Sequence, residues 1–194
     1  MKSILMKYIA EFTSLSDEQR QEIYGRIETR NYKKGAYLLR QGDMPKIKCY
    51  FVLKGCVRQY LIDETGKEVT TNFYIEEQAI PIFTEGNQDV PSKYSLTCLE
   101  DSLFVVGDPA VEKEMFTSYS QLETLVRKMM EANLREAQDE FAEFMHSSPE
   151  ERYKAILRNR PQLIDRVTQH QLASFLGMTP ESLSRIKKRM KTDK

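Results

Sequence analysis

The segment from Thr179 to Lys191 carries side chains that could read the bases of DNA. Glu181 and Arg185 lie four residues apart, so a helix beginning at Thr179-Pro180 places them on one face. A carboxylate can accept a hydrogen bond from cytosine N4, and a guanidinium can donate two to guanine O6 and N7. Because such a helix enters the major groove with its N-terminal turns, we also expect base contacts from Pro180, Ser182 and Ser184.

Other polar residues nearby are suited to the DNA backbone. Phosphate contacts position a protein without reading sequence, and we expect them from Lys187, Lys188, Arg189 and Lys191, together with Gln169 and His170 at the start of the preceding helix. The alternative for Glu181 and Arg185 is an ion pair on a solvated helix face. If the helix lies in the major groove, the ion pair and the base contacts are compatible, since pairing with the glutamate would orient the arginine toward the bases.

The spacing of these residues indicates a helix-turn-helix. Thr168 and Gln171 form a capping box that begins the first helix. Ala173 is small where two helices must cross closely, and Gly177 suits the sharp turn between them. The positions expected to face inward are Leu172, Ala173, Leu176, Leu183 and Ile186.

Charge is distributed unevenly along the chain. The 29 basic and 29 acidic residues cancel over the whole sequence. Residues 150–194, however, hold 11 Lys and Arg against 5 Asp and Glu, a local charge of +6, which leaves −6 on the remainder. A basic terminus on an acidic body favours a polyanion bound at one end.

The residues needed for metal binding and catalysis are scarce. The cysteines Cys49, Cys56 and Cys98 form no CxxC pair, and His146 and His170 are the two histidines, so we expect no metal site and no cofactor. No glycine-rich phosphate loop or nucleophile triad is apparent, so we expect no enzyme. With no run of 18 apolar residues and no signal-peptide pattern, the chain is expected to be cytoplasmic.

The first 108 residues predict one helix followed by many short strands. A capping box at Ser16 and Gln19 begins a helix that reaches about Thr29, with Leu15, Ile23 and Ile27 facing inward. From there to Asp108, runs rich in Tyr, Val, Phe, Leu and Ile alternate with turn signals, which favours a sandwich or barrel. The turns are expected at Lys34-Gly35, Gln41-Gly42-Asp43, Lys54-Gly55, Glu64-Thr65-Gly66 and Glu85-Gly86-Asn87.

A long helix is expected after the strands. Asp108-Pro109 begins a short helix. A capping box at Ser118 and Gln121 begins the long helix, which reaches about Ser147. Ser148-Pro149 begins the helix that follows it. The long apolar stripe favours pairing with a second copy through Leu122, Val126, Met129 and Asn133, continuing through Ala137, Phe141 and Phe144, with Asn133 as a register device. The alternative is a helix packed along its own barrel.

The sequence resembles the Crp/Fnr transcription regulators over about residues 10 to 190. The resemblance rests on Lys34-Gly35, Gly42-Asp43, Tyr50-Phe51-Val52-Leu53-Lys54-Gly55, Gly66-Lys67-Glu68, the long helix and the helix-turn-helix. It implies an α+β fold with a β-roll (double-stranded β-helix) like a cyclic nucleotide-binding domain in residues 1–117, a dimerisation helix in 118–147 and a DNA-binding helix-turn-helix in 148–194.

The resemblance also implies a function. Glu181-Ser182-Leu183-Ser184-Arg185 matches the family's E-x-x-S-R pattern, which is associated with TTGA-type half-sites. We therefore expect a bacterial homodimer that binds a palindrome on double-stranded DNA, with RNA polymerase as a further candidate partner. The family's β-hairpin wing is not matched by residues after the second helix, so we expect weak or strongly salt-dependent DNA binding. The alternative is a ligand-binding β-roll whose C-terminal helices mediate protein–protein contacts.

The expected effector pocket departs from the pattern of cyclic-nucleotide-binding relatives. Where they hold ribose and phosphate with Gly-Glu and Arg-Ser pairs, this chain has Glu76-Glu77-Gln78 and Pro91-Ser92-Lys93-Tyr94-Ser95. Lys93 can supply a point charge but not the bidentate fork of an arginine. Two neighbouring carboxylates would also disfavour an anion, so we expect an effector other than cyclic AMP. The candidate pocket residues are Glu76, Glu77, Ser92, Lys93 and Tyr94.

Overall fold

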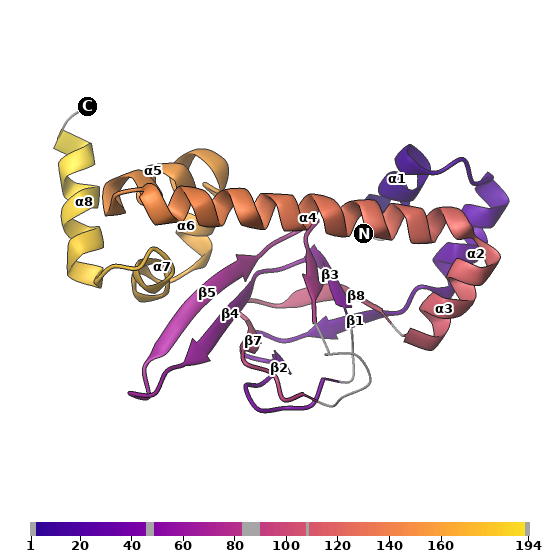
Figure 1. Cartoon of the computed structure of the whole chain (residues 1–194), viewed down its shortest axis with the longest axis horizontal. Coiled ribbons are helices and arrows are strands. Elements are labelled where there is room, and N and C mark those ends of the chain that lie inside the picture. The colour runs from indigo at the N-terminus through magenta and orange to yellow at the C-terminus, as the bar shows by residue number, and fades with distance from the viewer. Residues whose placement is uncertain (1–2, 46–48, 83–89, 108, 193–194) are drawn as a thin grey trace.

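The computed structural model describes residues 3–45, 49–82, 90–107 and 109–192. Its helices are α1 (Ser3–Phe12), α2 (Asp17–Arg26), α3 (Pro109–Ser118), α4 (Ser120–His146), α5 (Pro149–Asn159), α6 (Leu163–Arg166), α7 (Gln169–Phe175) and α8 (Pro180–Thr192). Its strands are β1 (Thr29–Tyr32), β2 (Tyr37–Leu39), β3 (Cys49–Lys54), β4 (Val57–Ile62), β5 (Glu68–Tyr74), β6 (Ala79–Pro81), β7 (Ser95–Cys98) and β8 (Ser102–Gly107). Helix α4 spans the length of the molecule, with the strands along one side of it and α5–α8 at its far end (Figure 1).

The strands form two antiparallel sheets, in the orders β1-β8-β3-β6 and β2-β7-β4-β5. Alternating apolar residues from both sheets meet between them. Val52 and Phe104 come from the first sheet, Val57 and Leu96 from the second, and none is more than 3% exposed. The two sheets with the long helix and the C-terminal helices confirm the predicted α+β fold with a β-roll.

The glycine turns explain how strands this short can connect. Gly35, Gly42, Gly55 and Gly66 all adopt positive φ, which confirms four predicted turns. The requirement is strictest at Gly55, where φ is +117° and an added Cβ would lie 2.1 Å from Ser102 Oγ. The fifth predicted turn, at Glu85-Gly86-Asn87, lies outside the described residues.

The helix termini mostly follow the predicted capping signals. Both bonds of the capping box are present at Ser16, Ser148 and Thr168. The box at Ser118 and Gln121 is wrong, since α4 begins without a side-chain cap and Gln121 Oε1 accepts instead from the Ser14 amide at 2.7 Å. Asp108, the expected cap of α3, lies outside the described residues.

Helix α1 was not predicted from the sequence, yet it helps to anchor α4. Its Ile9 is 3% exposed and packs in one cluster with Ile23 of α2 and with Leu122 and Leu125 of α4. The charged Lys7 and Glu11 that interrupt the apolar pattern are exposed on the other face. The beginning of α4 is therefore fixed to its own chain.

The described ranges hold neither a membrane-spanning helix nor a cluster of metal-binding side chains. None of the helices there has the length and apolar character to cross a membrane. The same part of the chain brings together no group of three or more His, Cys, Asp and Glu side chains that could hold a metal ion.

Candidate nucleic-acid interface and effector cavity

Helices α7 and α8 cross at a small residue, as the sequence predicted. Ala173 is fully buried at the crossing, and Leu172 and Leu183 are buried beside it. Gly177 adopts a φ of +66° in the turn, and an added Cβ there would lie 3.1 Å from both Phe144 and Arg152. The backbone conformation of the turn therefore favours glycine, and a side chain there would also crowd the Phe144 and Arg152 side chains at the end of α4. These features confirm the predicted helix-turn-helix packing.

One face of α8 is exposed along its length and carries the predicted base-reading residues. Glu181, Ser184 and Arg185 all have exposed side chains, and Lys188 and Lys191 continue the same side of the helix. The pKa of Glu181 lies below its ordinary value because its own backbone N–H and the Thr179 hydroxyl donate to the carboxylate. The acceptor is thus ionised at neutral pH, next to the positive Arg185.

Other predicted DNA-facing residues stabilise the start of α8. The Ser182 amide donates to Thr179 Oγ1 at 3.2 Å, as a helix cap does. Gln169 Nε2 donates to the Pro180 carbonyl at 3.0 Å and so joins the first turns of α7 and α8. His170 is exposed on α7. Gln169, His170 and the beginning of α8 therefore share one surface.

The four predicted phosphate-binding residues of α8 divide between two sides of the helix. Arg189 forms an ion pair with Glu150 at the start of α5. The Lys187 ammonium lies 5.7 Å from the centre of the Tyr153 ring, also on α5. Lys188 and Lys191 are exposed beside Arg185. The structure thus places Lys188 and Lys191 with the base-reading residues and turns Arg189 and Lys187 toward α5.

The apolar surface of α4 differs from the predicted stripe. Leu122 is 5% exposed and Met129 packs on the same cluster, so both belong to the core of their own chain. Val126 and Asn133 are half-buried. Beyond them a row faces solvent that joins Phe141 of the predicted stripe, at 66% exposure, with two residues that were not predicted, Leu134 at 61% and Met145 at 67%.

Helical spacing places this exposed row on one side of α4. Intervals of seven and four residues bring Leu134, Phe141 and Met145 to one face. The opposite face carries Glu136, Asp139 and Glu143 and borders a cleft that α4 shares with α5. Leu134 and Met145 could have been found in the sequence by testing a second heptad register.

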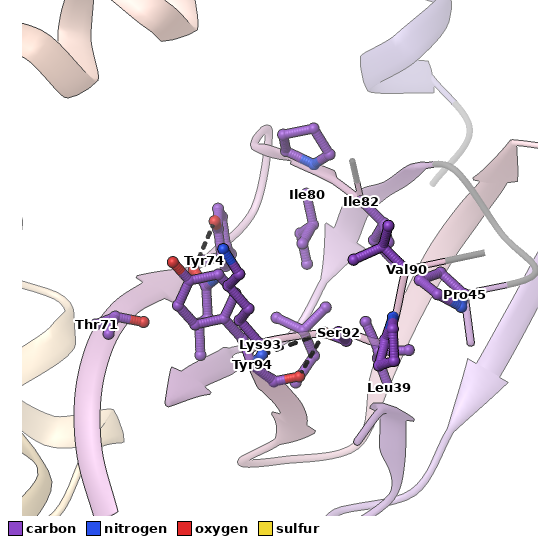
Figure 2. A pocket seen from close by; sticks show the side chains of 14 residues that line it. Leu39, Pro45, Thr71, Tyr74, Ile80, Ile82, Val90, Ser92, Lys93 and Tyr94 are labelled. Atoms are coloured by element: carbon purple, nitrogen blue, oxygen red, sulfur yellow. Dashed lines mark hydrogen bonds between the residues drawn. The ribbon is translucent and has the colours of Figure 1, made fainter. Parts of the chain in front are cut away.

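A cavity of about 440 Å³ is lined by strands β2, β4, β5 and β7 of the second sheet, by β6 of the first sheet and by residues 90–94 (Figure 2). Three of the candidate pocket residues, Ser92, Lys93 and Tyr94, line it, and Thr71 and Tyr74 of β5 join them at its polar end. The Tyr74 hydroxyl donates to Gln59 Oε1 at 3.0 Å, and burial raises the pKa of this phenol, so it stays a neutral donor. The apolar lining consists of Leu39, Pro45, Ile80, Pro81, Ile82, Val90, Pro91 and Leu96.

Glu76 and Glu77 are not among the residues that line this cavity. Glu76 instead accepts two hydrogen bonds from Arg166 of α6, at 2.7 and 2.9 Å, and one from the Gly55 amide at 2.8 Å. Glu77 is exposed in a tight turn with φ +67°. The sequence could not show this difference, because Arg166 lies 90 residues beyond Glu76.

Acid should weaken the Glu76–Arg166 contact. Burial alone would raise the pKa of Glu76, but hydrogen bonds from Arg166 and Gly55 lower it from 4.5 to about 2. A carboxyl group whose pKa is lower in the folded than in the unfolded state stabilises the fold at pH values above its unfolded-state pKa. This contribution is lost as the pH falls from about 4.5 toward about 2. We expect the free energy of unfolding, measured with urea, to fall in that range more steeply for wild type than for Glu76→Gln. Superimposable profiles would contradict this.

Comparison with known proteins connects these features to one fold. The family model described as "Cyclic nucleotide-binding domain" matches residues 29–118. No curated protein sequence matches the chain. Three solved structures with similar folds are those of FixK2 from Bradyrhizobium japonicum, the c-di-GMP-responsive global regulator CLP from Xanthomonas campestris, and a protein of Eubacterium rectale described as a transcriptional regulator of the Crp/Fnr family.

The similarity extends over most of each chain at low sequence identity. FixK2 is 16% identical with a TM-score of 0.72, covering 86% of this chain and 85% of its own. CLP is 15% identical with a TM-score of 0.68, covering 92% and 93%. The Eubacterium rectale protein is 15% identical with a TM-score of 0.65, covering 96% and 88%. At these identities the comparison supports a shared fold.

Proposed function

We propose that this chain, which has the Crp/Fnr fold and matches a cyclic nucleotide-binding domain over residues 29–118, is a sequence-specific DNA-binding transcription regulator. The observation that carries the proposal is the exposed face of α8. It presents an ionised acceptor at Glu181 and a bidentate donor at Arg185 on a capped helix at the outer end of the molecule (Figure 1). This role places the protein in the cytoplasm of a bacterium.

The regulator works as a homodimer through α4. Leu134, Phe141 and Met145 expose an apolar row that a parallel copy of the same helix would bury. Parallel pairing brings the two copies of α8 to the same end of the assembly. A protein of this symmetry binds a palindrome, and the Glu181 to Arg185 pattern favours TTGA-type half-sites. RNA polymerase is the candidate partner of the DNA-bound dimer.

The effector is a small organic molecule other than cyclic AMP. The cavity of about 440 Å³ is large enough for such a ligand and is mainly apolar. Its cationic residue is the exposed Lys93, which cannot form the two parallel bonds that an arginine makes to a phosphate. Glu76 is committed to Arg166.

A fluorescence anisotropy titration tests the proposal. The probes are a TTGA-type palindrome and a shuffled duplex of equal length, each at two salt concentrations, with and without cyclic AMP. Non-specific binding depends on released counterions and falls steeply with salt, so we expect the preference for the palindrome to persist while binding to the shuffled duplex is lost. Cyclic AMP should change neither curve. If the protein binds the palindrome and the shuffled duplex with equal affinity at each salt concentration, sequence-specific binding is refuted. That result would favour protein–protein contacts for the C-terminal helices.

A further inference from the structure

The unit formed by α5–α8 is joined to the rest of the chain on two sides. Next to the peptide link at Ser147, Arg152 donates to the Phe144 carbonyl at 2.9 Å and stacks on the Phe144 ring at 3.7 Å. On the other side, α7 rests on strand β5 of the second sheet (Figure 1), and Leu163 of α6 packs in one buried cluster with Phe73 of β5. The first attachment lies near a single point, so the second decides how far the unit can rotate about it.

Strand β5 provides a specific surface for α7. The Thr70 amide donates to Ser174 Oγ at 2.9 Å, and the rings of Phe73 and Phe175 meet edge to face at 5.3 Å. An irregularity in the β4–β5 register, opposite Gln59 and Tyr60, brings Thr70 and Phe73 to the same side of the strand. Thr70 is held in turn by Arg58, which donates to its hydroxyl at 2.9 Å.

Arg166 completes this attachment through two carboxylates from separate turns. Its two terminal nitrogens donate to both oxygens of Glu76, which follows β5, and one of them also donates to Glu100, which lies between β7 and β8. The Arg166 side chain is 19% exposed. A planar fork bound by two anions at different positions resists both sliding and rotation, which a single ion pair does not.

We propose that Arg166 is a positioning residue that sets the spacing between DNA half-sites recognised by the dimer. This rests on the proposed function. In a symmetric dimer the separation of the two α8 helices depends on how each helix-turn-helix is fixed to its own body. Figure 1 shows α8 crossing the direction of α4 at the outer end of the molecule, so rotation of the α5–α8 unit about Ser147 would change that separation.

The expected behaviour follows from the pitch of DNA. Moving one half-site by one base pair also rotates it by roughly 35°, since a turn holds about 10–10.5 base pairs. A rigid dimer loses its second contact under this change and with it about 100-fold in affinity. A dimer whose helix-turn-helix units can rotate tolerates the altered spacing, but binds the best site less tightly because each unit must be ordered on binding.

The test measures affinity for palindromes whose central spacer is unchanged, shortened or lengthened by one and by two base pairs. The variants are Arg166→Ala, Arg166→Lys, which keeps the charge but loses the fork, and Glu100→Gln, which removes one partner. Arg158→Ala is the matched control, because Arg158 belongs to the same unit and pairs with Glu143 at 3.6 Å on the opposite side. Hydrogen exchange of residues 68–74 and 169–176 is followed without DNA.

We expect Arg166→Ala to reduce the spacing discrimination from about 100-fold to less than about tenfold, with Arg166→Lys and Glu100→Gln between it and wild type and Arg158→Ala unchanged. The preference for particular bases within a half-site should be retained in these variants. General destabilisation of the helices would instead reduce this preference. An unchanged spacing preference in Arg166→Ala overturns the proposal. If wild type has no preference for any palindrome, the proposed function fails instead. In that case, unchanged hydrogen exchange in Arg166→Ala refutes the positioning role independently.

Discussion

The Phe141→Asp variant is expected to sediment as a monomer where wild type sediments as a dimer. Phe141 lies in the middle of the exposed apolar row of α4, between Leu134 and Met145. Pairing of two copies would bury the ring and remove its apolar surface from water. An aspartate at the same position would place two negative charges close to the two-fold axis, in a desolvated interface. Analytical ultracentrifugation at micromolar concentration measures the change directly.

The same substitution should weaken binding to the palindrome by about 100-fold or more. Once one half-site is bound, a dimer presents its second helix-turn-helix at a high effective concentration, and a monomer loses this advantage. Thr124→Asp is the matched control, because it adds the same charge to an exposed position on another side of α4. A Phe141→Asp protein that remains dimeric would refute α4 pairing through this row, and unchanged sedimentation of Thr124→Asp shows that charge alone does not separate the copies.

The Arg185→Ala variant should lose preference at one base pair of each half-site. A bidentate arginine contributes about 1–3 kcal/mol of discrimination against the wrong base, or roughly 5- to 150-fold. Because Arg185 is exposed beside the ionised Glu181, the loss should come from DNA contact and leave the thermal stability of the protein nearly unchanged. Anisotropy titrations against all four base pairs at each half-site position locate the affected one.

Lys188→Ala is the comparison for this prediction. Lys188 lies one turn beyond Ser184 on the exposed side of α8. A phosphate contact contributes the same to every sequence, so this variant should weaken all duplexes alike and reduce the salt dependence by about one ion. If Arg185→Ala also weakens every duplex equally, Arg185 is a phosphate contact and the base-reading assignment is incorrect.

The contacts of the basic residues also change how the charge distribution is interpreted. The excess of +6 in residues 150–194 includes Arg160 and Arg166, which donate to the β-roll, and Arg189, which pairs with Glu150. On the exposed face of α8 the basic residues are Arg185, Lys188 and Lys191. The polyanion interface is therefore smaller than the charge count suggests, and part of the basic segment holds the molecule together.

Local signals in the sequence were sufficient for the elements and for the outline of the fold. Capping boxes at Ser16, Ser148 and Thr168 satisfy backbone donors within four residues, so their helix termini depend on nothing distant. The positive φ at Gly55 and Gly177 is likewise a property of one residue that glycine supplies, although distant side chains also leave little room for a Cβ at both positions. The predicted box at Ser118 failed because Gln121 found a partner 107 residues away, at Ser14.

What the sequence determined by itself was the α+β architecture, the helix-turn-helix and the side chains suited to DNA, because periodicity, turns and caps are encoded within a few residues. The tertiary structure decided which side of α4 is left apolar and exposed, and that Glu76 binds Arg166 instead of lining the cavity. It also decided that Arg189 turns toward α5. The physical reason is common to these cases, since a side chain's partner is chosen by proximity after folding, and proximity between residues tens of positions apart leaves no local pattern to read.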